Sequence, residues 1–271
     1  MIRTGNAFLP KAPPEVDMVT NDWVLTFKNL FLPIYCKLCG VRILTEENGY
    51  FCPACWEQSP RIERPLCPAC GKPHAGAVGF ATRSNFPCAA CRSHPNPHVR
   101  RIFAPAQFDG AVAMAVKLLK FHGRQRLAEP LGDLMADFAR EEMDASQYHF
   151  IVPVPLHRVR ERTRGFNQSC LLARRITPSF PRAALDQSLK RIRPTRTQSR
   201  LDEPQRRNNV RGAFAVEGNP YQDKSILLVD DVVTTAETVS ECAKALRRAG
   251  AERIDVLAAA LATPHDDLDT L

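Results

Sequence analysis

Apolar and polar residues alternate along much of this chain with the periods of strands and helices. The segments 150–154 and 226–229 are continuous apolar runs rich in branched side chains, which is typical of strands buried on both faces of a parallel sheet. Apolar positions recur at helical spacing in 111–121, 131–138 and 237–249. Further strands are expected at 213–217 and 253–261. Strands that alternate with helices predict an α/β domain with a largely parallel sheet.

The first third of the chain has a different character. Residues 1–22 are polar and marked by proline, so we expect them to be flexible. Residues 23–32 carry apolar side chains at helical spacing, which predicts a short amphipathic helix packed on the rest of the protein. We therefore expect three parts: a flexible N-terminus with this helix (1–35), a cysteine-rich module (36–98) and the α/β domain (99–271).

The N-terminal sequence lacks the apolar core of a secretory signal peptide. No run of about eighteen apolar residues could span a membrane. We therefore expect a cytoplasmic protein without a membrane span. This expectation bears on the ten cysteines, because reducing compartments disfavour disulfides.

Eight of the ten cysteines form four C-x2-C pairs, which we interpret as ligands of two structural zinc ions. Two residues between thiolates let both sulfur atoms reach one tetrahedral ion, and four cysteines leave no coordination position open for a substrate. We favour sequential quartets, as in a double zinc ribbon, although the order of the pairs also permits an interleaved arrangement. The ligands would be Cys36, Cys39, Cys52 and Cys55 at one ion, and Cys67, Cys70, Cys88 and Cys91 at the other.

Two other interpretations of the cysteines carry less weight. A disulfide framework is typical of secreted proteins. A redox C-x-x-C site needs one pair, not four pairs repeated at loop spacing. The remaining two, Cys170 and Cys242, fall on predicted helices, where we expect small buried side chains rather than reactive thiols.

Positive charge is concentrated between residues 156 and 211. This segment contains fifteen Lys or Arg residues and four acids, which gives +11 in a chain whose net charge is +8. Guanidinium groups bind phosphate oxygens in bidentate fashion, so the segment suits either a pyrophosphate or a nucleic-acid backbone. A solvated basic face is the alternative, although acids would usually be more evenly interspersed in such a face.

The segment 226–238, ILLVDDVVTTAET, combines a buried strand, two adjacent carboxylates, a short turn and a helix. Backbone N–H groups at the start of such a helix suit a phosphate, and Thr234, Thr235 and Thr238 could add hydroxyl donors. Asp230 and Asp231 could accept hydrogen bonds from vicinal hydroxyls, directly or through hydrated Mg²⁺. A ribose 5-phosphate matches both halves of this site.

Three other interpretations of this segment are possible. A Walker B strand also ends in acids, but the chain has no G-x-x-x-x-G-K-[ST] loop to hold a nucleoside triphosphate. A receiver domain would need most of its residues downstream of the acidic pair, but only 41 residues follow Asp230. The third is an ordinary strand, acidic turn and helix with no ligand.

The segment 226–238 resembles the PRPP-binding motif of type I phosphoribosyltransferases. The blocks IVPVPLHRVRERTRGFNQSCLLAR (151–174) and RTQSRLDEPQRRNNVRGAF (196–214) are similar to signature blocks of the ComF family of competence-associated proteins. With the cysteine-rich segment, the resemblance covers residues 24–262. It implies a type I phosphoribosyltransferase-like domain with a Rossmann-like sheet, preceded by a double zinc ribbon.

The resemblance also implies roles for particular residues. Catalytic roles fall to Asp230, Asp231 and Arg196. PRPP and its phosphate would be bound by Val232, Val233, Thr234, Thr235, Ala236, Glu237 and Thr238. The pyrophosphate and flexible loops would contribute Arg164, Gly165, Asn167, Gln168, Thr197, Gln198, Arg207 and Asn209. Lys120 and Gly123 match a further family block.

This chain departs from the family pattern in the phosphate loop. Family members usually have T-T-G-A-T where this chain has Thr234 to Thr238 with Ala236 and Glu237 in the middle. Alanine tolerates positive φ poorly, and the Glu237 carboxylate would compete with a ligand phosphate for the start of the helix. We therefore expect a weakened phosphate loop, in which binding is retained and transferase activity is reduced or absent.

Two functions follow as hypotheses. The first is a phosphoribosyltransferase-domain protein that binds PRPP with Mg²⁺, linked to DNA uptake or nucleotide metabolism. The second is a non-catalytic adaptor that binds single-stranded DNA for the uptake machinery and contacts other uptake proteins. Binders of single strands usually interleave aromatic rings with basic residues, and the basic segment offers only Phe166 and Phe180, with Phe214 just beyond it.

Overall fold

The structure is a computed structural model that describes residues 33–43, 49–74, 86–194 and 210–262. The helix predicted at 23–32 lies outside these residues. In the cysteine-rich part the elements are β1 (Ile34–Tyr35), β2 (Arg42–Ile43), α2 (Pro53–Glu57) and α3 (Ala89–Ser93). Among the described residues, no helix has the length and apolar character that crossing a lipid bilayer requires.

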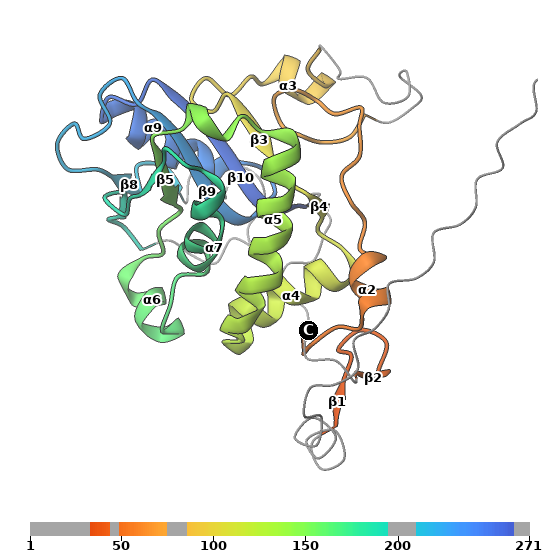
Figure 1. Cartoon of the computed structure of the whole chain (residues 1–271). Helices are drawn as coiled ribbons and strands as arrows, with labels where there is room; N and C mark the ends of the chain where they lie inside the picture. Colours follow the sequence, from red (N-terminus) through yellow and green to blue (C-terminus); the bar gives the residue numbers. More distant parts are fainter. Residues whose placement is uncertain (1–32, 44–48, 75–85, 195–209, 263–271) are drawn as a thin grey trace, which may run out of the picture.

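Strands and helices alternate through the rest of the described chain (Figure 1). The strands are β3 (Arg101–Phe103), β4 (Ala106–Gln107), β5 (Phe150–Pro153), β6 (Ala184–Leu185), β7 (Lys190–Arg191), β8 (Phe214–Ala215), β9 (Ser225–Val233) and β10 (Arg253–Leu261). The α-helices are α4 (Gly110–His122), α5 (Ala128–Glu142), α6 (Arg158–Arg164), α7 (Gln168–Ile176) and α9 (Glu237–Arg248). Single turns of 3-10 helix lie at Gln125–Leu127, Ala145–Gln147 and Thr177–Ser179.

A parallel sheet forms the centre of the molecule. Its order in the described residues is β3, β10, β9, β5 and β6, and β4 continues the β3 edge by pairing with β10. All of these pairings are parallel. The sheet confirms the predicted α/β fold.

Helices cover both faces of the sheet (Figure 1). Residues of α4, α5 and α7 pack on one face against Ile151, Leu227 and Leu257. Residues of α9 pack on the other face against Val152 and neighbouring strand residues. Successive side chains of one strand thus enter different cores, so the strands are apolar throughout rather than alternating.

Most of the predicted elements are present, with two corrections. The buried strand was expected to span 226–229, ahead of the acidic pair, but β9 continues through Val233, so Asp230 and Asp231 lie within the strand. The strand expected at 213–217 is reduced to β8, which pairs antiparallel with β7 outside the central sheet. The local apolar pattern could not show which partner this short strand would find.

The cysteine-rich segment packs on the α/β domain at two separate places. Ile43, Phe51 and Cys55 share a core with α4. The Ser59 hydroxyl donates to the Cys55 carbonyl at 3.3 Å and accepts from the Ala111 N–H at 3.1 Å, within the first turn of α4. Farther along the chain, Ile102 N–H donates to the Ala69 carbonyl at 2.9 Å, which ties the second half of the segment to β3. The domain boundary near residue 98 remains a prediction.

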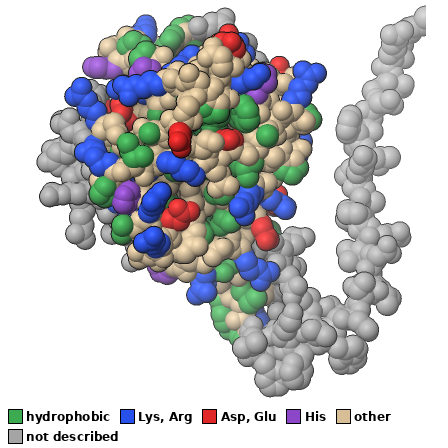
Figure 2. Space-filling view, turned by 90° about the vertical axis from the view of Figure 1, so that its left-hand side faces the viewer, with side chains coloured by type: hydrophobic (Ala, Val, Ile, Leu, Met, Phe, Trp, Pro, Cys, Tyr) green, Lys and Arg blue, Asp and Glu red, His purple; other side chains and the backbone are tan. Residues whose placement is uncertain are grey.

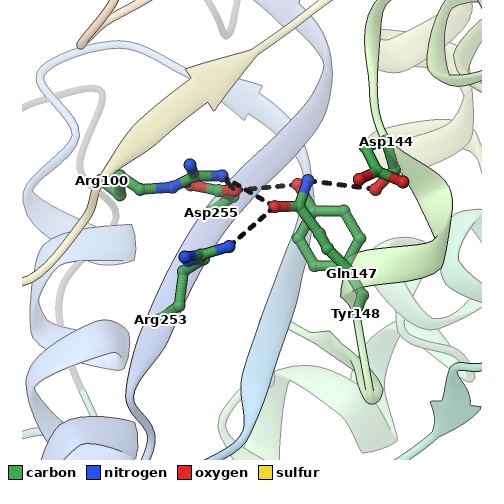
Figure 3. A network of polar contacts seen from close by, with 6 residues as sticks. All are labelled: Arg100, Asp144, Gln147, Tyr148, Arg253 and Asp255. Atoms are coloured by element: carbon green, nitrogen blue, oxygen red, sulfur yellow. Dashed lines mark hydrogen bonds and ion pairs between the residues drawn. The ribbon is translucent and has the colours of Figure 1, made fainter.

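A buried acid links three elements at the amino-terminal end of the sheet (Figure 3). Asp255 on β10 is fully buried, accepts a hydrogen bond from the Tyr148 hydroxyl at 2.8 Å and forms an ion pair with Arg100. Gln147 accepts hydrogen bonds from Arg100 and Arg253. A buried carboxylate requires such partners, so this network fixes β10 against the segments that precede β3 and β5.

Candidate functional site

A cavity of about 170 Å³ lies at the carboxyl ends of β5 and β9, where the residues of the 226–238 motif meet those of the basic segment. The chain leaves β5 through α7 on one face of the sheet and leaves β9 through α9 on the other. The two connections therefore run in opposite directions from neighbouring strands. Such a switch point is where open α/β sheets bind their ligands.

The acidic pair lies at the floor of this cavity and is almost completely buried. Asp230 is 8% exposed and Asp231 is 2% exposed. Asp230 Oδ1 accepts hydrogen bonds from the Ser169 hydroxyl and from the Asp231 N–H, both at 2.9 Å. Asp231 Oδ1 accepts from the Val232 N–H at 2.9 Å, and Asp231 Oδ2 is 2.8 Å from Lys120 Nζ. Each carboxylate is therefore held by a different helix, Asp230 by α7 and Asp231 by α4.

The environment of Asp230 makes its ionisation costly. Burial, and then the neighbouring charge of Asp231, raise the pKa of Asp230 to about 7. Lys120, the Asp231 N–H and the Ser169 hydroxyl oppose this rise. Strongly shifted pKa values of this kind cluster at binding and catalytic sites, where function rather than stability favours a buried charged residue.

The turn after β9 has the form of a phosphate loop. Ala236 adopts a left-handed conformation with φ +61° directly before α9, and its side chain makes no cap hydrogen bond to the helix. Glycine adopts this conformation at no steric cost, whereas alanine costs about 1 kcal/mol or more in this region. Glu237 occupies the first turn of α9 and lines the cavity, so its carboxylate lies near the position expected for a phosphate.

Basic side chains also line the cavity. Arg160 and Arg164 lie four residues apart on α6, and both line the cavity with Arg191 of β7. Burial lowers the pKa of Arg164 and of Arg191, as expected for guanidinium groups that are removed from water. Figure 2 shows Lys and Arg side chains over much of the face that carries α6 and α9, with fewer acids among them.

The structure brings together most of the described residues that the sequence singled out. Besides Lys120, the cavity is lined by Arg164, Gln168, Asp230, Asp231, Val232, Val233, Thr234, Thr235, Ala236, Glu237 and Thr238. The predicted residues Arg196, Thr197, Gln198, Arg207 and Asn209 lie outside the described part of the chain. Gln168 contributes by accepting a hydrogen bond from Arg164 at 2.6 Å.

Two predicted residues act next to the cavity rather than in it. Asn167 caps α7, accepting from the Ser169 N–H and donating to the Val154 carbonyl, each at 3.0 Å. Gly165 ends α6 with φ +81°, and a side chain there would meet nothing within 4 Å. The glycine is therefore explained by its left-handed backbone conformation.

Sequence reasoning missed three residues of the site. Ser169 was an unremarked position in a helix, and Arg191 belongs to a two-residue strand with no recognisable pattern. Arg160 could have been found, because it lies one helical turn before Arg164 and must share its face.

The eight paired cysteines form two groups that fit structural zinc. Cys36, Cys39, Cys52 and Cys55 make one group and Cys67, Cys70, Cys88 and Cys91 the other, with the sulfur atoms of each group within 4.8 Å of one another. This is the sequential arrangement. The Cys39–Cys52 and Cys70–Cys88 sulfur separations are 3.7 Å and 3.8 Å. Tetrahedral zinc with bonds of about 2.3 Å requires separations of this size, and they are far too long for disulfides.

One cysteine of each group has thiolate character, whereas contacts with the other cysteines and burial raise the pKa of Cys55, Cys70 and Cys91. Burial would raise the pKa of Cys36, but the backbone N–H groups of Cys39, Cys52 and Leu38 lower it to about 6. Burial likewise opposes ionisation of Cys67, but the backbone N–H groups of Cys70, Cys88 and Ala69 lower its pKa to about 7. Backbone donors that converge on one sulfur are typical of zinc knuckles, where the ligand is the thiolate.

Comparison with known proteins agrees with the geometry of both parts. Residues 27–92 match the family model of the double zinc ribbon domain, and residues 172–269 match that of the phosphoribosyl transferase domain. The protein is therefore of a class in which a double zinc ribbon precedes a phosphoribosyltransferase-like α/β domain.

Its relatives extend over nearly the whole chain. The DNA utilization protein YhgH of Escherichia coli O157:H7 is 34% identical over 84% of this chain and 96% of its own length. Competence protein F of Haemophilus influenzae is 28% identical over 83% of this chain and 96% of its own. Competence protein ComFC of Bacillus subtilis is 25% identical over 76% and 82%. The chain belongs to the ComF family.

Solved structures are more distant. A purine phosphoribosyltransferase from Pyrococcus horikoshii is 12% identical, with a TM-score of 0.30 over 53% of this chain and 91% of that one. Such a low score adds nothing to the assignment of the family.

We expect the purified protein to contain two zinc ions, one for each cysteine group. Cys52→Ser and Cys91→Ser should each reduce the content by one, because each removes a ligand from a different group. Cys170→Ser is the matched control, since Cys170 lies in α7 outside both groups and should leave two ions bound. Elemental mass spectrometry measures the content. Loss of both ions in either single variant would contradict two independent sites.

We expect Asp230→Asn to stabilise the ligand-free protein at pH 8, because it removes a charge buried beside Asp231. The pKa of Asp230 is about 7 in the folded protein against 3.8 ordinarily. The folded state thus binds more protons between these values, and the free energy of unfolding falls as pH rises through this window. The melting temperature should rise by a few degrees at pH 8 and by less at pH 5. An equal rise in melting temperature at pH 5 and at pH 8 would contradict an origin in the buried charge of Asp230. So would an equal rise in the exposed control variant Asp137→Asn.

Proposed function

We propose that this protein binds PRPP or a related ribose 5-phosphate ligand in the cavity between β5 and β9. The observation that carries the proposal is a buried acidic pair in one cavity with two groups suited to phosphates. The N-terminal turn of α9 is one group, and Arg160, Arg164 and Arg191 are the other. A ligand with phosphate at both ends of a ribose matches this combination of groups.

Each part of such a ligand has a distinct set of partners. The 5-phosphate would bind the N–H groups at the start of α9 with Thr234 and Thr235, and the ribose hydroxyls would donate to the acidic pair. The three arginines would bind the pyrophosphate. Mg²⁺, which prefers hard oxygen donors, would bind the oxygens of the pyrophosphate.

The site is better suited to binding than to rapid turnover. Phosphoribosyl transfer needs no protein nucleophile, because pyrophosphate leaves an oxocarbenium-like ribose that an acceptor attacks, and the enzyme stabilises the leaving charge. Here Arg160, Arg164 and Arg191 would stabilise the charge of the leaving pyrophosphate. The strained Ala236 and the carboxylate of Glu237 both weaken the phosphate loop, so any transferase activity is expected to be low.

The names of the relatives give the proposal a biological setting. Proteins called DNA utilization protein and competence protein F match this chain over most of its length. We propose that the ribose phosphate site serves DNA uptake, or the nucleotide metabolism that follows it, in a cytoplasmic protein.

Thermal unfolding with PRPP and Mg²⁺ tests the proposal. The ligand should raise the melting temperature of the wild type by several degrees, since a ligand at about 100 times its Kd adds about 2.7 kcal/mol. Asp230→Asn/Asp231→Asn should abolish the shift. Asp133→Asn/Asp137→Asn alters two acids on α5 outside the cavity and should preserve it. No shift in the wild type at millimolar ligand would exclude a working PRPP site.

A second candidate function, binding of single-stranded DNA, is favoured by the two faces of α6. Arg160 and Arg164 line the cavity, whereas Arg158 and Arg162 are exposed on the helix. The outer pair could contact a DNA backbone while the inner pair binds the ribose phosphate ligand. Phe166, Phe180 and Phe214 are all buried, so the rings in and next to the basic segment cannot stack on bases.

Single-stranded DNA binding through α6 predicts a specific pattern of loss. Arg158→Ala/Arg162→Ala should weaken oligonucleotide binding and lower the slope of log affinity against log salt by about 1, while the PRPP-induced thermal shift persists. Arg160→Ala/Arg164→Ala is the matched control and should lose the PRPP shift. Equal oligonucleotide affinity in the wild type and the outer-pair variant would reject this surface.

A further inference from the structure

The acidic pair already has a partner for most of its oxygen atoms. Asp230 Oδ1 accepts two hydrogen bonds, Asp231 Oδ1 accepts one, and Asp231 Oδ2 forms the ion pair with Lys120. Both hydrogen bonds to Asp230 are accepted by Oδ1, which leaves Asp230 Oδ2 as the oxygen with neither a hydrogen bond nor an ion pair from the described residues. A divalent ion bound through Asp231 Oδ2 would therefore have to displace the lysine.

Lys120 is placed for this contact by its helix. It lies in the last turn of α4, its side chain is 19% exposed, and its ammonium group lines the same cavity as the acidic pair. Asp231 Oδ2 has no hydrogen bond of good geometry, so Lys120 acts on it as a charge rather than as an aligned donor. Surface ion pairs contribute little, but a lysine against a carboxylate that is 3% exposed is screened much less.

Lys117 shows that this arrangement is specific to one lysine of the helix. It lies one turn earlier on α4, where its ammonium group is 6.0 Å from the centre of the Phe108 ring. It does not line the cavity. The same helix thus directs one lysine to the acidic pair and another to an aromatic ring.

We propose that Lys120 is a built-in counter-ion of the acidic pair, so that the ribose monophosphate half of the ligand binds without a divalent cation. This proposal rests on the ribose phosphate site proposed above. Two adjacent buried carboxylates would repel an anionic ligand, and Lys120 halves their net charge before the ligand arrives. The ribose hydroxyls then need only an acceptor, which Asp230 Oδ2 supplies. Dependence on Mg²⁺ is confined to the pyrophosphate half.

The test compares ribose 5-phosphate with PRPP, each with Mg²⁺ and in buffers depleted of divalent ions by a chelating resin. The protein itself is not exposed to chelators, so its cysteine groups are not disturbed. For the wild type, ribose 5-phosphate should give the same thermal shift and the same Kd in both buffers. PRPP should bind more weakly without Mg²⁺. A requirement for Mg²⁺ in the binding of ribose 5-phosphate would overturn the proposal, whatever the variants do.

Variants of Lys120 provide the second arm. Lys120→Met should weaken ribose 5-phosphate binding at least roughly tenfold in the depleted buffer, with partial recovery on adding Mg²⁺. Lys120→Arg keeps the charge and should remain independent of Mg²⁺, and Lys117→Met should behave as the wild type. Wild-type affinity in a folded Lys120→Met variant would overturn the role of this lysine. If neither ribose 5-phosphate nor PRPP raises the melting temperature of the wild type even with Mg²⁺, the proposed function itself fails. The measurement with PRPP and Mg²⁺ distinguishes that outcome from a failure of the role of Lys120 alone.

Discussion

The burial of two adjacent carboxylates inside β9 is the constraint on which the rest of the site depends. A strand in the middle of a parallel sheet is the most apolar environment in the fold, and charged groups there need partners from outside the sheet. Ser169 of α7 and Lys120 of α4 meet this need from separate helices. The positions of both helices on the sheet are thus tied to the chemistry at its edge.

The cysteine-rich segment takes part in the same arrangement. Ser59 connects the carbonyl of Cys55 to the first turn of α4, and the last turn of that helix carries Lys120. One rigid helix therefore joins the first cysteine group to the acidic pair. The second group is fixed independently, against β3 through Ala69. The two groups are similar in sequence and geometry, but the first contacts α4 and the second contacts β3.

The sequence was sufficient for features that depend on local pattern. Runs of branched apolar residues located β5 and the first half of β9, cysteine spacing predicted both groups, and the 226–238 motif placed the acidic pair at the edge of the sheet that carries the cavity. It was insufficient where a residue acts through a distant partner. Ser169 and Asp230 are 61 positions apart, and nothing local marks either as the partner of the other. The end of β9 was misplaced because the apolar run stops at Val229, whereas the sheet accommodates the two aspartates by means of Ser169 and Lys120.

The strand order also determines when the central sheet can be completed during synthesis of the chain. β10 lies between β9 on one side and β3 with β4 on the other, although β3 and β4 precede it by some 150 residues. During synthesis these early strands have no sheet partner until the last described strand leaves the ribosome. All eight paired cysteines lie before residue 92 and are available much sooner. Metal-dependent folding of the N-terminal part can thus precede completion of the sheet. The cysteine-rich segment is then already folded against β3 when β10 is synthesised and pairs with that strand.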